Sequence, residues 1–73
     1  HRLLKKTVPC QHGDDVEWLQ CELSYHGFLV RKDIDGIFGK NTENAVGRFQ
    51  KKVGITVDKK GGAVTISYLK ATN

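Results

Sequence analysis

The sequence lacks any long run of apolar residues. No window approaches the roughly 18 apolar residues that a membrane-spanning helix needs, and the first residues hold no apolar core of a secretory signal peptide. We therefore expect no membrane partner for this chain. The sequence also lacks an initial methionine and begins with His1. We expect it to be a processed product or a piece of a longer protein.

Cysteine is scarce as well. Cys10 and Cys21 are the only two cysteines, so the chain can form at most one internal disulfide. A chain of 73 residues allows one small core of marginal stability, which a cross-link would help. We expect a Cys10–Cys21 disulfide that fastens an N-terminal arm, residues 1–12, to the first helix, with free buried thiols as the alternative.

The sequence lacks the Cys-x2–4-Cys spacing that structural zinc sites use. Four side chains that can bind zinc do occur within 17 residues of each other: Cys10, His12, Cys21 and His26. His12 precedes the first predicted helix and His26 lies near its far end, so the four side chains converge poorly. We expect no metal site and no cofactor.

Positive charge exceeds negative charge only slightly. Twelve Lys and Arg residues against eight Asp and Glu residues give a net charge of +4. This excess fits an acidic partner such as nucleic acid, anionic lipid or an anionic cell wall, and it fits solubility alone equally well. The basic residues are scattered and form no stripe on one element, which argues against a nucleic-acid partner.

The sequence does contain three helical segments. The first is predicted at about 15–26, because Asp14 and Glu17 form a capping box and Gly27 suits the left-handed residue that follows a helix. Its core face carries Val16, Leu19 and Leu23 at helical spacing.

Two further helices follow. Thr42 is predicted to cap the second helix, which Gly54 ends, and Thr65 to cap a short third helix that buries Ile66 and Leu69. The core face of the second helix carries Ala45, Val46, Phe49 and Val53. The predicted fold class is therefore all-α, a compact three-helix domain.

A repeat relates the starts of the second and third helices. Asp35, Gly39, Thr42 and Val46 recur 23 positions later as Asp58, Gly62, Thr65 and Leu69. The two Asp residues are predicted to organise turns, and Gln20 and Gln50 to bond loop backbone. Paired carboxylates also cleave glycosides, and Asp35, Glu43 and Asp58 are candidates for that chemistry. A small three-helix domain leaves little room for a water-excluding cleft, so we expect no catalysis.

Three motifs in order carry a resemblance to a known family. They are Gly13-Asp14-Asp15-Val16-x-x-Leu19-Gln20-x-x-Leu23, then Asp35-Gly36-Ile37-Phe38-Gly39-x-x-Thr42 with Ala45-Val46-x-x-Phe49-Gln50, and in part Asp58, Gly62, Thr65 and Leu69. Over about residues 13–69 the chain resembles the peptidoglycan-binding domain family, small three-helix modules attached to bacterial and phage cell-wall hydrolases. The resemblance implies a binding domain over 13–73 that follows the arm.

The resemblance also implies a function. A module of this kind is not an enzyme; it binds the glycan and stem peptide of peptidoglycan and tethers an attached amidase, muramidase or endolysin to its substrate. We expect a monomer that is secreted or associated with the cell wall, or that is encoded by a phage and acts on the cell wall. The alternative is a protein-interaction or propeptide domain within a larger extracellular hydrolase. The inhibitory cysteine motif of such propeptides does not occur at the C-terminal end, which argues against that alternative.

The ligand is expected to contact the second helix. Aromatic rings suit sugar faces, and Lys or Arg suits the carboxylates of stem peptides. The candidates are the outer residues of the second helix with one aromatic residue of the third: Lys40, Asn44, Gly47, Arg48, Lys51 and Tyr68. An ordinary solvated helix face is the alternative.

The first helix has a second apolar face, made of Trp18, Cys21 and Tyr25. An apolar surface of this size needs an explanation. We expect either that the N-terminal arm covers it, or that it is a binding patch or a dock for a neighbouring domain.

Overall fold

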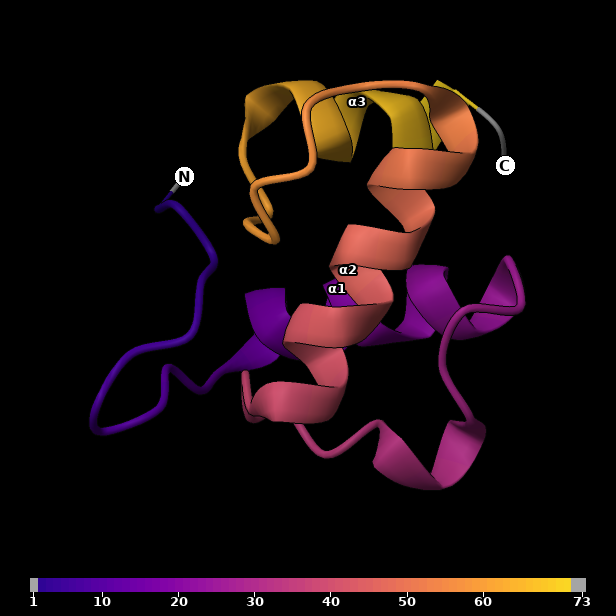
Figure 1. Cartoon of the computed structure of the whole chain (residues 1–73). Coiled ribbons are helices and arrows are strands. Elements are labelled where there is room, and N and C mark those ends of the chain that lie inside the picture. The colour runs from indigo at the N-terminus through magenta and orange to yellow at the C-terminus, as the bar shows by residue number, and fades with distance from the viewer. Residues whose placement is uncertain (1, 72–73) are drawn as a thin grey trace.

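Within residues 2–71, three α-helices joined by two long loops surround one core (Figure 1). The computed structural model describes residues 2–71. Helix α1 spans Asp14–Tyr25, a short 3-10 helix η1 spans Arg31–Asp33, α2 spans Lys40–Val53 and α3 spans Ala63–Ala71. The all-α prediction is confirmed. The expected domain limits of 1–12 and 13–73 include residues 1, 72 and 73, which lie outside the described residues.

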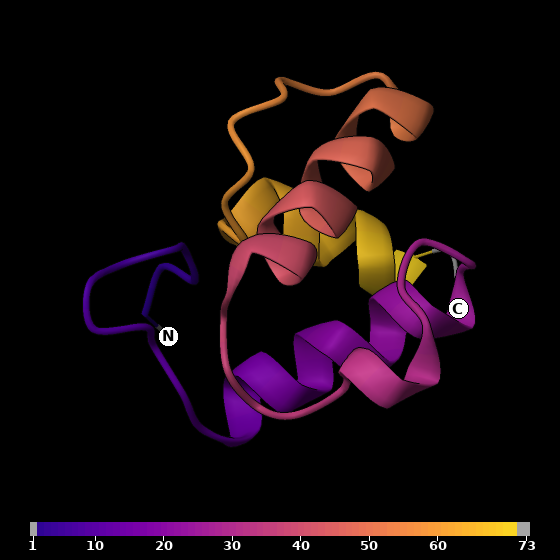
Figure 2. The same ribbon diagram turned by 60° about the horizontal axis from the view of Figure 1, so that its bottom comes forward.

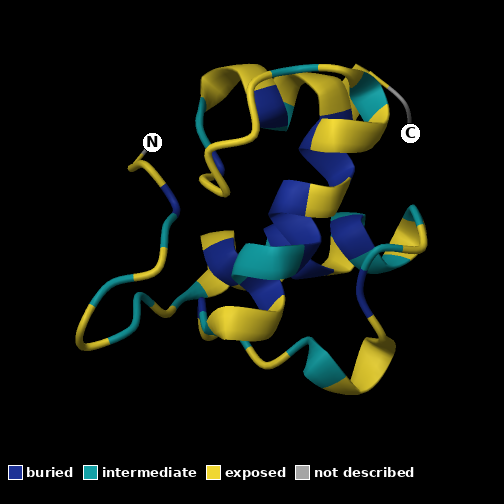
Figure 3. Ribbon diagram, viewed as in Figure 1, coloured by how far each residue is buried: buried dark blue, intermediate teal, exposed yellow. Residues whose placement is uncertain are grey.

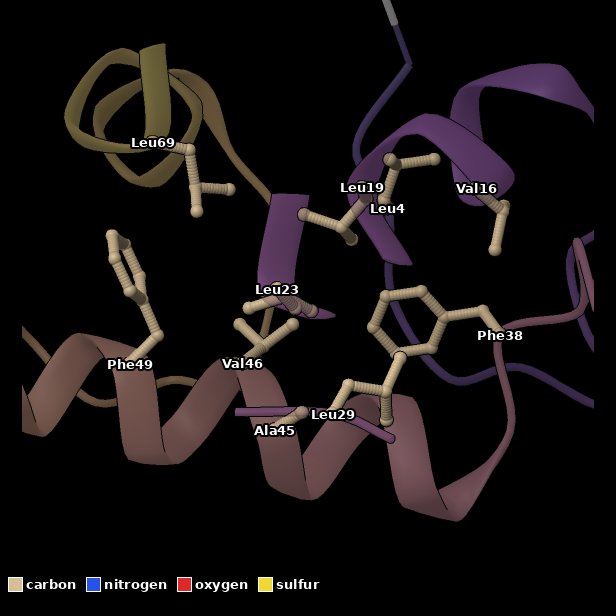
Figure 4. Close-up of a cluster of buried hydrophobic side chains, with 10 residues drawn as sticks. All are labelled: Leu4, Val16, Leu19, Leu23, Leu29, Phe38, Ala45, Val46, Phe49 and Leu69. Carbon is tan, nitrogen blue, oxygen red and sulfur yellow. The ribbon is translucent and has the colours of Figure 1, made fainter. Parts of the chain in front are cut away.

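The core lies where the three helices face one another (Figures 3 and 4). Its buried apolar side chains come from all three helices, from the arm and from the loop before α2: Leu4, Val16, Leu19, Leu23, Leu29, Phe38, Ala45, Val46, Phe49 and Leu69. Fully burying one large apolar side chain contributes about 1.5–3 kcal/mol. The predicted core faces of α1 and α2 are therefore confirmed, apart from the half-buried Val53.

Helix α1 ends as predicted but begins differently. At its end, Gly27 adopts a left-handed conformation with φ of 84°, and the N–H of Phe28 donates to the Leu23 carbonyl at 2.8 Å. At its start, the predicted capping box is wrong, because the flanking residue is Gly13 and no side chain caps the helix. The Asp15 carboxylate accepts instead from the adjacent N–H of Val16 at 2.9 Å.

The threonines predicted to cap α2 and α3 do not cap them. Helix α2 already begins at Lys40, and α3 at Ala63, so Thr42 and Thr65 both lie inside the first turn. Both side chains are buried. Each hydroxyl accepts a hydrogen bond from a buried glutamine amide, and this tertiary contact replaces the local capping bond.

Gln20 is the centre of the first loop. Its Oε1 accepts from the backbone N–H groups of Asp35 and Gly36, at 3.1 and 2.8 Å. Its Nε2 lies within 3.0 Å of the Ile37 carbonyl and 2.8 Å of the Thr42 hydroxyl, to which it donates. One buried amide therefore holds the turn and the start of α2 against α1.

Gln50 holds the second loop in the same way. Its Oε1 accepts from the N–H of Lys59 at 2.9 Å. Its Nε2 donates toward the Asp58 carboxylate at 2.8 Å, the Lys60 carbonyl at 3.1 Å and the Thr65 hydroxyl at 2.9 Å. The prediction that both glutamines bond loop backbone is confirmed, and the repeat is one bonding pattern used twice.

The N-terminal arm connects to both loops. Leu4 pairs with Gly61 and His12 with Ile37 in isolated antiparallel bridges, so the arm lies beside the segment that precedes α3 (Figures 1 and 2). Arg2 adds an ion pair with Asp15 of α1, with Nε 2.7 Å from Oδ2.

The predicted Cys10–Cys21 disulfide is wrong, because both cysteines are free. The backbone bonds of residues 11–13 to the loop before α2 hold that end of the arm at the start of α1. Cys21 lies about 10 Å further along the helix axis, whereas a disulfide needs Cα atoms within about 7 Å. Cys21 and Tyr25 remain exposed, so the arm does not cover this part of the second apolar face.

Candidate functional site

The outer face of α2 carries a row of polar side chains. Lys40, Asn44 and Arg48 follow one another at intervals of four residues, and Lys51 comes three residues later. Residues at these spacings lie on one side of a helix. Asn44 is half-buried and the three cationic residues are exposed. The structure thus brings four of the six predicted binding residues together as one surface, which we call the α2 face.

Two of these residues line a hollow beside the helix. Asn44 and Arg48 face the segment from Gly27 to Val30 across a space of about 290 Å³. The guanidinium of Arg48 donates to the Phe28 carbonyl at 2.7 Å. Arg48 therefore anchors the loop after α1, and its remaining N–H groups are donors at the rim.

Asn41 and Asp33 belong to the same surface, although sequence reasoning missed them. Both line this hollow and also a neighbouring one of about 200 Å³, which Lys40 borders. The Asn41 Nδ2 lies 3.4 Å from an Asp33 carboxylate oxygen. The spacing of Asn41, Asn44 and Arg48 placed Asn41 on this side of α2, and that signal could have found it. Asp33 comes from η1, for which the sequence offered no signal.

Gly47 lies beside the row but is covered, and Tyr68 lies on another helix. Gly47 is buried, and a Cβ added there would lie 3.1 Å from Cγ of Lys59. The missing side chain thus makes room for the stem of Lys59. Tyr68 is exposed, but on α3.

Two of the three carboxylates that are candidates for catalysis, Asp35 and Asp58, serve the loops. Asp35 accepts from the N–H of Ile37 at 2.9 Å, and Asp58 accepts from the N–H of Lys60 at 3.0 Å. Two hydrogen bonds lower the pKa of Asp35: the bond from the Ile37 N–H has the larger effect and the bond from Gln20 the smaller. Two hydrogen bonds likewise lower the pKa of Asp58: the bond from Gln50 has the larger effect and the bond from the Lys60 N–H the smaller. Both groups are therefore held ionised, which suits turn formation and not general-acid chemistry.

The polar side chains of α2 and of the segment before it offer amides, cations and two carboxylates around two hollows. These groups can bond amides, hydroxyls and carboxylates of a polar polymer. Between residues 2 and 71, no helix is both long and apolar enough to cross a membrane. No group of three or more His, Cys, Asp and Glu side chains in that range could hold a metal ion.

The chain belongs to the peptidoglycan-binding domain family, whose model matches residues 12–69. It is therefore a binding module and not a catalytic domain. The chain is 48% identical over 61 residues to the spore cortex-lytic enzyme of Bacillus cereus, a match that covers 82% of this chain and 23% of that enzyme. It is 50% identical over 46 residues to the spore cortex-lytic enzyme of Halalkalibacterium halodurans, covering 63% and 14%.

A solved structure agrees with these matches. The crystal structure of the SleB N-terminal domain superposes with a TM-score of 0.87 and 38% sequence identity, and the alignment covers 99% of this chain and 94% of that one. The chain spans less than a quarter of the length of the curated relatives that it matches.

Proposed function

We propose that this chain binds bacterial peptidoglycan through the α2 face, as the substrate-tethering module of a wall-lytic enzyme. The observation that supports this proposal best is the α2 face itself, in a chain of this family. Four polar residues in a row and two adjoining hollows form a surface along the helix. Such a surface suits an extended polymer better than a small molecule, which usually needs a deeper, mostly apolar pocket.

The chemistry of the ligand matches the residues. A peptidoglycan strand presents acetamido groups, hydroxyls, peptide amides and stem carboxylates. Asn41 and Asn44 can donate to and accept from the amides, while Lys40, Arg48 and Lys51 can pair with the carboxylates. Gly47 acts indirectly, by admitting the stem of Lys59 next to this helix. Tyr68 provides a ring for a sugar face on α3.

The relatives support a longer parent chain. Each is a cortex-lytic enzyme of which the matched region is less than a quarter. We propose that the parent chain of this module also contains a lytic domain, of the amidase, muramidase or endolysin type. This domain acts outside the cell on the wall. The module then raises the local concentration of substrate at the lytic domain and performs no chemistry itself.

Co-sedimentation tests this function. The chain is mixed with purified sacculi free of teichoic acid, and separately with duplex DNA, at low and moderate salt. We expect it to pellet with sacculi at both salt concentrations and to lose any affinity for DNA as salt increases. A chain that stays in solution with sacculi, or that binds only DNA, contradicts the proposal.

A further inference from the structure

A second recess lies away from the α2 face, between the N-terminal arm, α1 and α3. Its volume is about 710 Å³, which is within the range of 300–1,000 Å³ that ligand pockets occupy. It shares no lining residue with the hollows beside α2. The arm and the segment before α3, which both contribute to its lining, lie side by side in Figures 1 and 2. We call it the Trp18 groove.

The Trp18 groove has an aromatic and aliphatic wall. Trp18 is half-buried, packs against the core and lines the groove. Leu3 on the arm, which is 42% exposed, and Ile66 on α3 add apolar surface. An indole ring that lines a groove beside aliphatic side chains suits the C–H face of a sugar or another flat amphipathic group.

The charges that line the groove balance. Arg2 is paired with Asp15, with its Nη2 2.9 Å from Oδ1 and its Nε 2.7 Å from Oδ2. Asp14 and Lys70 remain, one of each sign, as polar groups in the lining. A lining without net charge favours a neutral occupant over an anionic stem peptide or nucleic acid.

The polar groups are placed to hydrogen-bond a hydroxylated ligand. Ser67 offers a hydroxyl and Asp14 a carboxylate along the lining. The Nζ of Lys70 is 5.8 Å from the centroid of the Trp18 ring. That distance is near the outer limit for a cation–π contact, so the contact is weak. The Lys70 ammonium can therefore leave the ring and donate to a ligand hydroxyl at little cost. Aromatic wall, neutral charge and polar lining together describe a site for an uncharged sugar.

We infer that the Trp18 groove holds an N-acetylhexosamine unit of a glycan strand. The sugar ring stacks on Trp18, and the acetamido methyl group contacts Leu3 and Ile66. The inference rests on the proposed function, because it assigns one sugar of the glycan to this groove, in addition to the contacts proposed for the α2 face and Tyr68.

Trp18 is the only tryptophan in the chain, so its fluorescence reports on this groove alone. The chain is titrated with chitotetraose, a neutral β1,4-linked N-acetylglucosamine tetramer without peptide, and with cellotetraose, which lacks the acetamido groups. We expect a saturable change in Trp18 emission with chitotetraose only. An equal response to both sugars overturns the assignment to acetamido sugars. Emission that changes with protein concentration in the absence of sugar assigns the groove to a second copy and also overturns it.

A blocking variant keeps the reporter in place. Ser67→Arg fills the groove from an exposed position and retains Trp18, while Val64→Arg adds the same charge at an exposed position of α3 outside the lining. We expect Ser67→Arg to weaken chitotetraose binding at least tenfold and Val64→Arg to leave it unchanged, with circular dichroism confirming that both fold.

Co-sedimentation with sacculi separates the two proposals. Wild type that pellets with sacculi but shows no response to chitotetraose overturns the groove assignment and leaves the proposed function standing. Wild type that does not pellet overturns the proposed function itself.

Discussion

At the scale of single residues, two buried glutamines organise this molecule. A carboxamide is suited to the task because it accepts hydrogen bonds at one end and donates them at the other. Gln20 and Gln50 each use both ends, toward loop N–H groups and toward a threonine hydroxyl. Every fully buried side-chain nitrogen or oxygen in residues 2–71 has a partner, so removing either amide leaves its partners unpaired.

Gln20→Ala should therefore destabilise the protein strongly. Each backbone or hydroxyl group left unpaired in the interior costs about 1–3 kcal/mol, so we expect the free energy of unfolding to fall by about 3 kcal/mol or more. Urea denaturation followed by circular dichroism measures this change. Cys21→Ala is the matched control, since the neighbouring thiol is exposed and unbonded, and it should cost less than about 0.5 kcal/mol. Similar losses in both variants would refute the role of Gln20.

The Arg2–Asp15 pair predicts a dependence of stability on pH. The hydrogen bond from Arg2 lowers the pKa of Asp15 from 3.8 to about 2. A carboxylate whose pKa falls on folding stabilises the folded state above the unfolded pKa and loses that effect as pH drops. The contribution of Asp15 is thus complete above about pH 4 and lost between about pH 4 and pH 2.

Thermal denaturation from pH 5 to pH 2 tests this window. Arg2→Ala should lower the melting temperature near neutral pH and flatten its fall between pH 4 and pH 2. Part of the fall should persist, because the pKa values of Asp35 and Asp58 are lowered too. Lys6→Ala removes the same charge from an exposed position of the arm and should keep the full pH dependence. If the two variants gave identical curves, the ion pair would not be the cause.

At the scale of elements, the two loop-to-helix turns have the same bonds but different backbones. Gly36 follows Asp35 with φ of 74°, and Lys59 follows Asp58 with φ of 60°. A left-handed conformation costs an L-residue about 1–2 kcal/mol, which glycine avoids. Lys59 offsets part of this cost by laying its stem on Gly47 of α2. The strained lysine and the mid-helix glycine are therefore one structural feature.

Their coupling can be measured with a double-mutant cycle. Gly47→Ala alone gains about 1 kcal/mol of helix propensity but crowds the stem of Lys59, so we expect little net change. Lys59→Gly alone relieves the backbone and loses the packing. In the double variant, Lys59→Gly makes room for the methyl group that Gly47→Ala adds. We therefore expect the free energy of unfolding of the double variant to exceed the value given by the sum of the single changes by at least 0.5 kcal/mol. Additive changes in the free energy of unfolding would show that the two positions are independent.

The elements were largely predictable from the sequence, and their starts were not. Apolar spacing identified the core faces of α1 and α2, and the glycines that end these helices were found because their signal is local. Thr42 and Thr65 have a strong local preference for helix caps, but partners far along the chain, Gln20 and Gln50, take their hydroxyls. The prediction of a Cys10–Cys21 disulfide failed for a similar reason, because the β-bridge between His12 and Ile37 sets the position of the arm.

The candidate site was predictable where helical spacing alone decides it. That spacing placed Lys40, Asn44, Arg48 and Lys51 on one side of α2. It could not show that Gly47 is covered by Lys59, because that contact depends on the path of a loop 12 residues away. The Trp18 groove was foreseen only as an apolar surface, since its other walls come from the arm and from α3.

At the scale of the whole molecule, structural and binding tasks fall on different residues. The repeated Gln and Thr residues are buried, and together with the exposed repeated Asp residues they hold loops to helices. The α2 face and the Trp18 groove consist of residues outside the bonds of the repeat. This separation explains how a chain of 73 residues can keep one fold while its surface contacts a polymer. It also explains why the distinctive motifs identify the family and not the ligand contacts.

The most direct test of the account is a binding isotherm with purified sacculi. It compares wild type with Lys40→Glu/Lys51→Glu, and with Lys6→Glu/Lys32→Glu, a control of equal net charge whose exposed positions lie outside the α2 face. We predict that wild type binds, that the α2 variant binds at least tenfold more weakly, a loss of about 1.4 kcal/mol, and that the control binds like wild type. Equal affinities for all three proteins, or no binding by wild type, would contradict the account.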